Sequence, residues 1–354
     1  MRFLVPRNDI ELLNNQKTYR LQFLVLAIVL CICFFVNISL GSVSVPLKGI
    51  FGILFGTIEN TTWDVIVMDY RLPKAITAIL VGSGLGISGL LMQTLFRNPL
   101  AGPFVLGISS GASLGVALVI LGSGLFGGLF ATALISKWSI VIAASLGSFL
   151  VLLAVLAVSS KVRDTMAILI IGLMFGSITA AVVSVLSYFS SAEQLQQYIF
   201  WGFGSLGSLS WNELLIFFGI YATGLVLSIA SIKGLNSLLL GDNYAKSLGL
   251  NLKQSRLIII LATSLIAGTI TAFAGPIAFI GLAIPHLTRQ IFKTSNHKVL
   301  LPAVFLFGAI VMLICDSIAQ LPTSDYTLPI NAITALVGAP VVIWLLVRQR
   351  KMMF

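Results

Sequence analysis

Charged residues are scarce in this chain of 354 residues: Asp, Glu, Lys and Arg together make up only 9% of it. A soluble globular domain carries roughly 25% charged residues, so this shortage excludes an ordinary water-soluble enzyme. Histidine and cysteine are rarer still, with two and three residues. His286 and His297 are eleven positions apart, and the cysteines have the spacing of neither a zinc site nor a disulfide framework. We therefore expect no metal site in the chain.

Hydrophobic residues, in contrast, make up 58% of the sequence and gather in long runs. A transmembrane helix needs about 20 mostly apolar residues to cross about 30 Å of hydrocarbon. Nine apolar stretches without Asp, Glu, Lys or Arg are long enough to matter: 21–47, 75–96, 98–136, 138–160, 165–192, 214–232, 257–288, 299–315 and 326–347. The sequence therefore predicts an all-α, polytopic membrane protein.

The positions of Lys and Arg predict the orientation, because these residues concentrate in short cytoplasmic loops. If the basic clusters that alternate with the apolar stretches are cytoplasmic, they hold 17 of the 21 Lys and Arg residues. The other four, Lys48, Arg71, Lys74 and Lys137, then lie outside. Both termini are predicted to be cytoplasmic. Most of the net charge of +10 is then explained by the orientation of the chain in the membrane.

Stretch 257–288 has basic loops at both ends, so it must cross the membrane an even number of times. Ala274-Gly275-Pro276 interrupts it, because proline lacks a backbone donor and glycine weakens a helix. Two short helices here bring the predicted total to about ten. We expect a cytoplasmic segment at 1–20, a transmembrane domain at 21–347 and a cytoplasmic tail at 348–354.

Many of the 32 glycines have helical spacing. Such spacing favours tight contact between helices in lipid, where small residues allow close approach, and a helix that lines a pathway is the alternative. The segments with this spacing are 82–86, 107–115 and 172–176. The first of them lacks the Lys-Ser/Thr pair of a phosphate-binding loop, so ATP, if it drives the protein, must bind another polypeptide.

Asp316 is the clearest acidic residue within an apolar run. Carboxylates inside membranes often couple transport to protons or ions, which is one hypothesis for this residue. It lies toward the predicted outer end of its helix, so an interfacial structural role is the other.

The largest cytoplasmic loop, 233–256, is more apolar than a solvated loop requires. Asp242 is a plausible N-cap of a short helix in it, with Gly249 at the C-terminal end. The loop is either a docking surface for a cytoplasmic partner or an interfacial helix on lipid.

Several motifs occur together and in a fixed order between about residue 65 and residue 347. They are Arg71-Leu72-Pro73-Lys74, Phe96-Arg97-Asn98-Pro99-Leu100-Ala101, Leu106-Gly107-Ile108-Ser109-Ser110-Gly111-Ala112, Gly241-Asp242 through Leu250, Ala274-Gly275-Pro276 through His286, Leu328-Pro329-Ile330 and Gly338-Ala339-Pro340. With these motifs the sequence resembles the membrane-spanning permeases of FecCD-type ABC importers, which move iron-siderophores, haem or cobalamin.

The resemblance implies a multi-pass protein of the bacterial cytoplasmic (inner) membrane that performs no bond chemistry itself. A second permease subunit, identical or paralogous, would pair with it around a central pathway. Two cytoplasmic ATPases would dock below and hold ATP and Mg²⁺, and this chain would bind no cofactor. An external binding protein would dock on basic residues of the outer face, and nucleic acid would not be a partner.

The resemblance also assigns roles to particular residues. Arg71 and Lys74 match the positions that meet the binding protein, and Gln320 stands where a relative has a third basic contact. Asn98 and Leu100 match one turn of the cytoplasmic gate, and Asp164, Thr165 and Met166 align with the second turn. The ATPase-coupling segment matches at Gly241, Asp242, Ala245, Leu248 and Gly249, and the pathway helix at Gly172, Gly176, Ser177, Thr179 and Ser184.

The predicted function is ATP-driven import by alternating access, with an iron(III)-siderophore as the first substrate hypothesis and haem or cobalamin as the alternatives. A secondary transporter driven by ions through Asp316 is a rival interpretation, with helices broken at Pro276 and Pro285. A membrane scaffold or receptor that transports nothing is a third.

Overall fold

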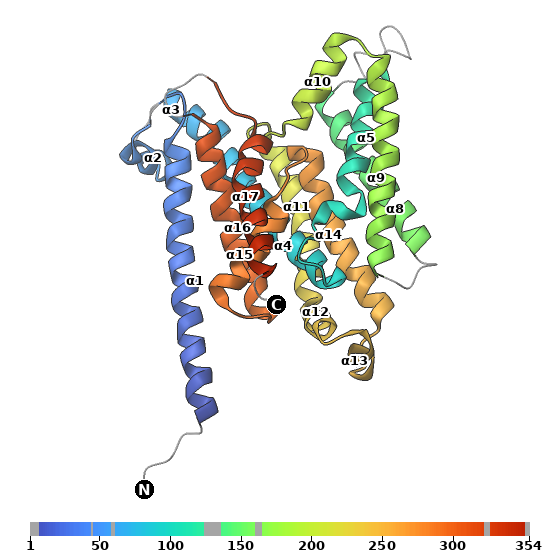
Figure 1. Ribbon diagram of the computed structural model, residues 1–354. Coiled ribbons are helices and arrows are strands. Elements are labelled where there is room, and N and C mark those ends of the chain that lie inside the picture. Colours follow the sequence, from blue (N-terminus) through green and yellow to red (C-terminus); the bar gives the residue numbers. More distant parts are fainter. Residues whose placement is uncertain are drawn as a thin grey trace.

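The computed structural model describes residues 7–43, 45–57, 61–123, 136–159, 165–321 and 326–350. Within them the fold is all-α, as predicted, and Figure 1 shows a bundle of mainly upright helices. The longer helices are α1 (Arg7–Ser39), α4 (Leu72–Phe96), α8 (Lys137–Ser159), α9 (Thr165–Tyr188), α11 (Trp211–Ala230), α14 (Leu252–Ala274), α16 (His297–Ala319) and α17 (Ile330–Arg350). The shorter ones are α2 (Leu47–Leu54), α3 (Thr61–Val65), the π-helix η1 (Ile66–Arg71), the 3₁₀-helix η2 (Pro103–Leu106), α5 (Ile108–Ile120), α10 (Ala192–Gly202), α12 (Ile232–Leu239), α13 (Asp242–Ser247) and α15 (Ile280–Phe292).

Seven helices in the described part of the chain are long and apolar enough to cross a membrane. Their spans are Thr18–Ser39, Thr62–Phe96, Lys137–Val155, Ile170–Tyr188, Trp211–Ala230, Leu252–Ala274 and His297–Ala319. Two shorter apolar helices, Ile108–Ile120 and Ile330–Trp344, and the 13-residue α15 belong to the same bundle (Figure 1). The multi-pass architecture is confirmed, and the total of about ten crossings stays a prediction.

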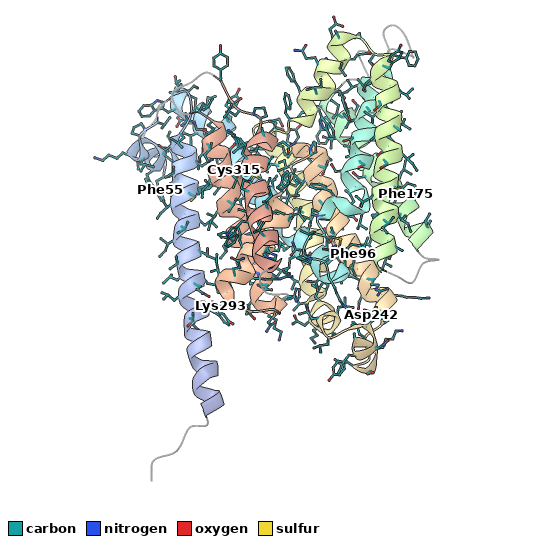
Figure 2. All side chains as sticks on the ribbon, in the orientation of Figure 1. Phe55, Phe96, Phe175, Asp242, Lys293 and Cys315 are labelled. Carbon is teal, nitrogen blue, oxygen red and sulfur yellow. The ribbon has the colours of Figure 1, made fainter. Side chains whose placement is uncertain are left out.

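The two ends of the bundle carry different short helices. At one end, which we call the α13 end, lie α12 and α13, and α1 begins and α17 ends toward it (Figure 1). At the opposite end, the α10 end, lie α2, α3 and α10. Figure 2 places Asp242 and Lys293 toward the α13 end and Phe55 and Cys315 toward the other. Segments predicted to be cytoplasmic therefore share the α13 end.

Helix α4 runs through the middle of the bundle, and every residue from Leu80 to Phe96 is buried. It packs against α11, α14, α15 and α16. A Cβ atom on Gly82 would overlap the carbonyl oxygen of Gly308 in α16, and one on Gly89 would overlap that of Gly281 in α15. Helices attract one another in lipid mainly through close packing, so these glycines let the backbones touch. The predicted packing role of residues 82–86 is confirmed at Gly82.

The predicted interruption within stretch 257–288 is confirmed. Helix α14 ends at Ala274, and Gly275 follows with a φ of 79°, a left-handed backbone that favours glycine. Residues 275–279 are not helical, and α15 begins at Ile280. The amide N–H of Ala278 donates to the side-chain oxygen of Asn331 at 3.0 Å, so the break is anchored to α17.

The contact between α4 and α15 yields a stability prediction. In Gly89→Ala the new methyl group meets the Gly281 backbone, and we expect overpacking to lower the free energy of unfolding by about 1–3 kcal/mol. Thermal unfolding of the purified protein in detergent measures the change. Gly219→Ala in α11 is the matched control, because no atom lies within 4 Å of a Cβ there. Equal melting temperatures for the two variants would contradict the predicted contact.

Candidate functional site

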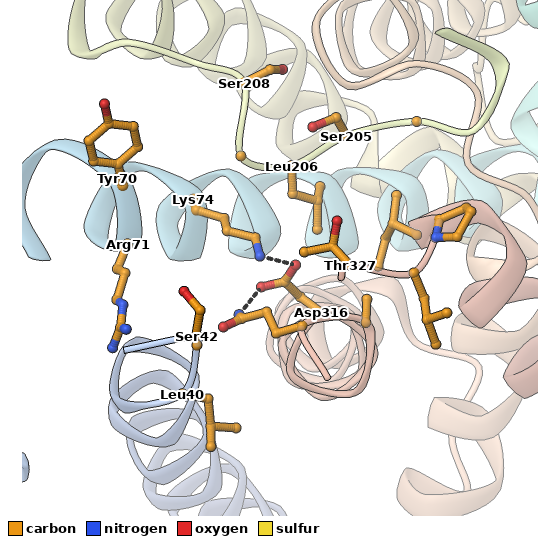
Figure 3. Close-up of a pocket in the computed structure, with 18 of the residues that line it drawn as sticks. Leu40, Ser42, Tyr70, Arg71, Lys74, Ser205, Leu206, Ser208, Asp316 and Thr327 are labelled. Carbon is orange, nitrogen blue, oxygen red and sulfur yellow. Dashed lines mark hydrogen bonds and ion pairs between the residues drawn. The ribbon is translucent and has the colours of Figure 1, made fainter. Parts of the chain in front are cut away.

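Asp316 is the centre of a polar cluster toward the α10 end of the bundle (Figure 3). The residue is 2% exposed, and the ammonium group of Lys74 lies 3.1 Å from its carboxylate. The side-chain amides of Asn37 and Gln320 donate to the same carboxylate at 2.9 and 2.8 Å. One buried carboxylate thus joins α1, α4 and α16, and its charge is both paired and hydrogen-bonded. These contacts favour the structural role that the sequence left open for Asp316.

Arg71 serves a different purpose in the same region. Its guanidinium donates to the carbonyl oxygens of Ile38 at 2.8 Å and Ser39 at 3.0 Å, and also to that of Val43. The last carbonyls of a helix lack intrahelical donors, so Arg71 satisfies the end of α1. The side chain therefore fixes α1 against the beginning of α4.

The three residues predicted to meet a binding protein line one cavity of about 710 Å³. Arg71, Lys74 and Gln320 share it with Asp316 and with residues of the connecting segments 40–43, 203–208 and 327–330 (Figure 3). The structure thus brings the three predicted residues together, and their docking role stays a prediction. The sequence motifs did not place Asp316 beside these residues, or Asn37 beside Asp316. The i, i+4 spacing of Asp316 and Gln320 on a helix was a usable signal.

The first predicted gate turn follows α4 at the α13 end. Arg97 ends the helix in a left-handed conformation with a φ of 47°. The N–H of Asn98 donates back to the carbonyl of Gln93 at 3.1 Å, and the Asn98 side chain accepts from the N–H of Leu100 at 2.9 Å. Leu100 is 45% exposed. The turn is thus stabilised by a backbone bond to α4 and by the Asn98 side chain, and it presents an apolar side chain at the surface.

The second predicted gate turn is only partly covered by the structure. Asp164 lies outside the described residues. Thr165 and Met166 form the start of α9, and their side chains also lie outside the described part. The pairing of the two turns stays a prediction.

The predicted coupling segment folds into α12 and α13, joined at Gly241, whose φ is 107°. Helix α13 starts at Asp242, so the N-cap is Gly241 and the predicted capping role of Asp242 is wrong by one position. Gly249 has a φ of 82° directly after the helix, as a C-terminal glycine should. Leu248 is 59% exposed, whereas Ala245 is fully buried. Of these two residues, Leu248 alone is accessible to a partner.

Asp242 is instead held by two arginines. Arg97 Nη2 lies 2.8 Å from one carboxylate oxygen and Arg256 Nη2 lies 2.5 Å from the other. Arg97 also donates through Nε to the carbonyl of Leu238 at 3.2 Å. This ion-pair cluster connects the gate turn, the coupling segment and α14, and the motifs of the sequence did not reveal it.

The predicted pathway residues of α9 fall on two faces. Gly172 and Thr179 are buried, and Gly176 faces the side chain of Ser110 in α5. In this structure these three residues serve the packing of α9 rather than an open surface. Ser177 and Ser184 are exposed, so only this pair can line a pathway along the helix in this conformation.

A membrane bundle with a polar cavity at one end and an exposed apolar segment at the other has the architecture of a transport subunit, and the comparisons identify the kind. Residues 29–348 match the FecCD transport family. The hemin transport system permease protein of Yersinia pestis is 34% identical over 340 residues, which cover 96% of this chain and 99% of that protein. The vitamin B12 import system permease protein of Citrobacter koseri is 37% identical over 81% of this chain and 84% of its own.

A solved structure is also similar. It is described as a metal-chelate type ABC transporter in an inward-facing conformation, with a TM-score of 0.79 and 32% identity over 92% of this chain and 98% of that one. The chain belongs to the FecCD transport family and is the permease of an ABC importer. It is a transport subunit and not an enzyme.

The cluster around Asp316 yields a prediction that separates its two roles. Asp316→Asn leaves Lys74 without its counter-ion, and we expect the free energy of unfolding to fall by about 3 kcal/mol or more. Removing both charges in Lys74→Gln/Asp316→Asn should recover part of the loss. Melting temperatures in detergent measure both effects, and Asp69→Asn, at an exposed position, is the control. A variant of Asp316 with unchanged stability but abolished uptake would support ion coupling instead.

Proposed function

We propose that this permease carries a large metal chelate inward across the bacterial cytoplasmic membrane, with an iron(III)-siderophore as the first candidate. Haem and cobalamin are the alternatives, since relatives are named for transport of hemin and vitamin B12. A second permease subunit, identical or paralogous, completes the pathway. Two ATPases bind at the α13 end and hold ATP and Mg²⁺, and an external binding protein docks at the α10 end.

The observation that carries the proposal is the exposed apolar surface of the coupling segment. Leu240, Tyr244 and Leu248 are 61%, 57% and 59% exposed on two short helices beyond the end of the bundle. Large apolar side chains gathered at a surface are typical of a protein interface. Buried Ala245 and the paired Asp242 give this surface a fixed shape. A rigid apolar surface of this kind suits the docking of an ATPase.

The charge and shape of the cavity support the proposed docking of a binding protein at the α10 end. Arg71 and Lys74 line the cavity at the α10 end, where an acidic side chain of a binding protein would find two cations. Lys74 is also paired with Asp316, so an approaching carboxylate competes with an internal one. Gln320 is neutral and itself bonded to Asp316, which leaves this corner less basic than three cations would make it.

The substrate class is supported by the exposed face of α9. The hydroxyl of Ser177 donates to the carbonyl of Leu173 at 3.2 Å, and that of Ser184 donates to the carbonyl of Ala180 at 2.9 Å. Because these donors are occupied within the helix, the face offers few strong polar contacts. A weakly polar face allows a bulky chelate to pass without tight binding.

The coupling surface is tested by Leu248→Asp. A charge at this exposed apolar position should prevent the ATPase from docking, and we expect ATP-driven uptake to fall by about tenfold or more, which corresponds to roughly 1.4 kcal/mol of lost binding. Uptake and ATP hydrolysis are measured in proteoliposomes that contain the complete transporter. Thr62→Asp, at an exposed position on α3 toward the α10 end, is the matched control. Full uptake in the Leu248 variant would contradict the assignment of this surface.

The substrate is tested with the cognate binding protein. Its affinity for a ferric siderophore, for haem and for cobalamin is measured by titration, and each complex is then supplied to proteoliposomes with and without internal ATP. We expect ATP-dependent accumulation of the ferric siderophore, and a vanadate block is the control. Uptake of haem or cobalamin alone would replace the siderophore by that alternative. Uptake that needs no ATPase and collapses with an uncoupler would favour a secondary transporter.

A further inference from the structure

The last turn of α4 is connected to the coupling segment at two separate points. The first is the ion pair between Arg97 and Asp242, reinforced by the bond from Arg97 Nε to the carbonyl of Leu238 in α12. Arg97 is the residue directly before the gate turn. A single side chain therefore spans the distance from the gate turn to both helices of the coupling segment.

The second connection is a chain of hydrogen bonds that begins at the half-buried Asn236 of α12 and becomes fully buried toward α4. The side-chain oxygen of Asn236 in α12 accepts from the backbone N–H of His297 at 2.9 Å and lies 2.7 Å from His297 Nδ1. His297 Nε2 in turn lies 2.8 Å from the hydroxyl of Thr94. His297 is fully buried and Thr94 nearly so. This chain of contacts ends one turn before Arg97 on the same helix.

The gate turn is attached to that same last turn of α4. Asn98 is bonded to the backbone of Gln93, and the side chain of Gln93 contacts both Leu282 and Arg289 in α15. Direct polar contacts therefore connect α12 and α13 with the last turn of α4 and with the gate turn. The two connections also differ: the Arg97 and Asp242 side chains are 47% and 39% exposed, so their contact is the one that can break and form again.

We propose that Arg97 is a positioning residue that transmits the movement of the coupling segment to the gate turn Asn98–Leu100 through its ion pair with Asp242. This proposal rests on the proposed function, since it assumes that ATPases move α12 and α13. Arg256 holds the other oxygen of Asp242 from α14 and keeps the carboxylate oriented toward Arg97. When the coupling segment shifts, Asp242 carries Arg97 with it, and the turn that follows changes its exposure.

The first test uses coupling in the complete transporter. In Arg97→Gln we expect the ATP hydrolysed per substrate imported to rise by about fivefold or more, which is the range of a typical coupling between two sites. Asp242→Asn should raise it at least as much, because it also weakens the contact with Arg256. The double variant should be no worse than Asp242→Asn alone, because both changes remove the same contact between Arg97 and Asp242. Arg20→Gln, which removes an equal charge at an exposed position of α1, is the control and should stay near the unmodified ratio.

The second test reads the gate itself. A cysteine at Leu100 is labelled with a maleimide from the α13 side, with and without ATP. We expect ATP to change the labelling rate in the otherwise unmodified complex and in Arg20→Gln, and to leave it unchanged in Arg97→Gln. Arg97→Lys, which keeps the charge but loses the Nε contact to Leu238, should give an intermediate response and covers the case in which Arg97→Gln does not assemble.

The outcomes separate this proposal from the proposed function. An unmodified complex without ATP-driven uptake contradicts the proposed function itself. Normal uptake in that complex together with ATP-dependent labelling in Arg97→Gln overturns only the role of Arg97. Equal effects of Arg97→Gln and Arg20→Gln also overturn it, because they indicate a general loss of charge. Additive effects of the Arg97 and Asp242 variants overturn it as well, because they indicate that the two residues do not act through one shared contact.

Discussion

Close backbone contact around α4 is the constraint on which the rest of the structure depends. In lipid, burial of apolar side chains provides little attraction between helices, so the helices must approach until their backbones pack. Gly82 meets Gly308 of α16, and Gly89 meets Gly281 of α15. Because α4 is held along its length, its two ends are fixed relative to each other. One rigid helix therefore connects Lys74 near one end with the gate turn that follows the other end.

The sequence was sufficient for the fold class because composition and apolar run length respond directly to the bilayer. The break at Ala274-Gly275-Pro276 was also predictable, since it depends on local backbone chemistry. Glycine spacing predicted that helices touch, but it did not say which ones. Gly308 lies more than 200 residues from Gly82 in the chain, and a single sequence contains no information on that pairing.

The sequence likewise predicted which residues gather at the site, but not the contacts between them. Motif resemblance placed Arg71, Lys74 and Gln320 together, and they do line one cavity. It could not reveal that Asp316 binds two of them, because hydrogen-bond partners from three helices depend on the final packing. The motif also could not predict which of its side chains are exposed. Ala245 and Leu248 both lie in the coupling motif, yet Ala245 is buried and Leu248 projects outward. That difference depends on how α13 packs on α14 and cannot be obtained from the motif.

The ion pairs at the two ends of α4 differ in a way that bears on mechanism. The pair at the α10 end includes a carboxylate that is 3% exposed, and separating it would leave a buried charge without its partner at a cost of several kcal/mol. The pair at the α13 end is 47% and 39% exposed, and water replaces its contacts at little cost. Because α4 itself is packed along its length, the exposed ion pair beyond its end, and not the helix, is the contact that can break and form again. In the proposed function, movement that ATPases drive at the α13 end acts on the exposed pair beside the gate turn. The contacts of Asp316 keep α1, α4 and α16 joined at the other end.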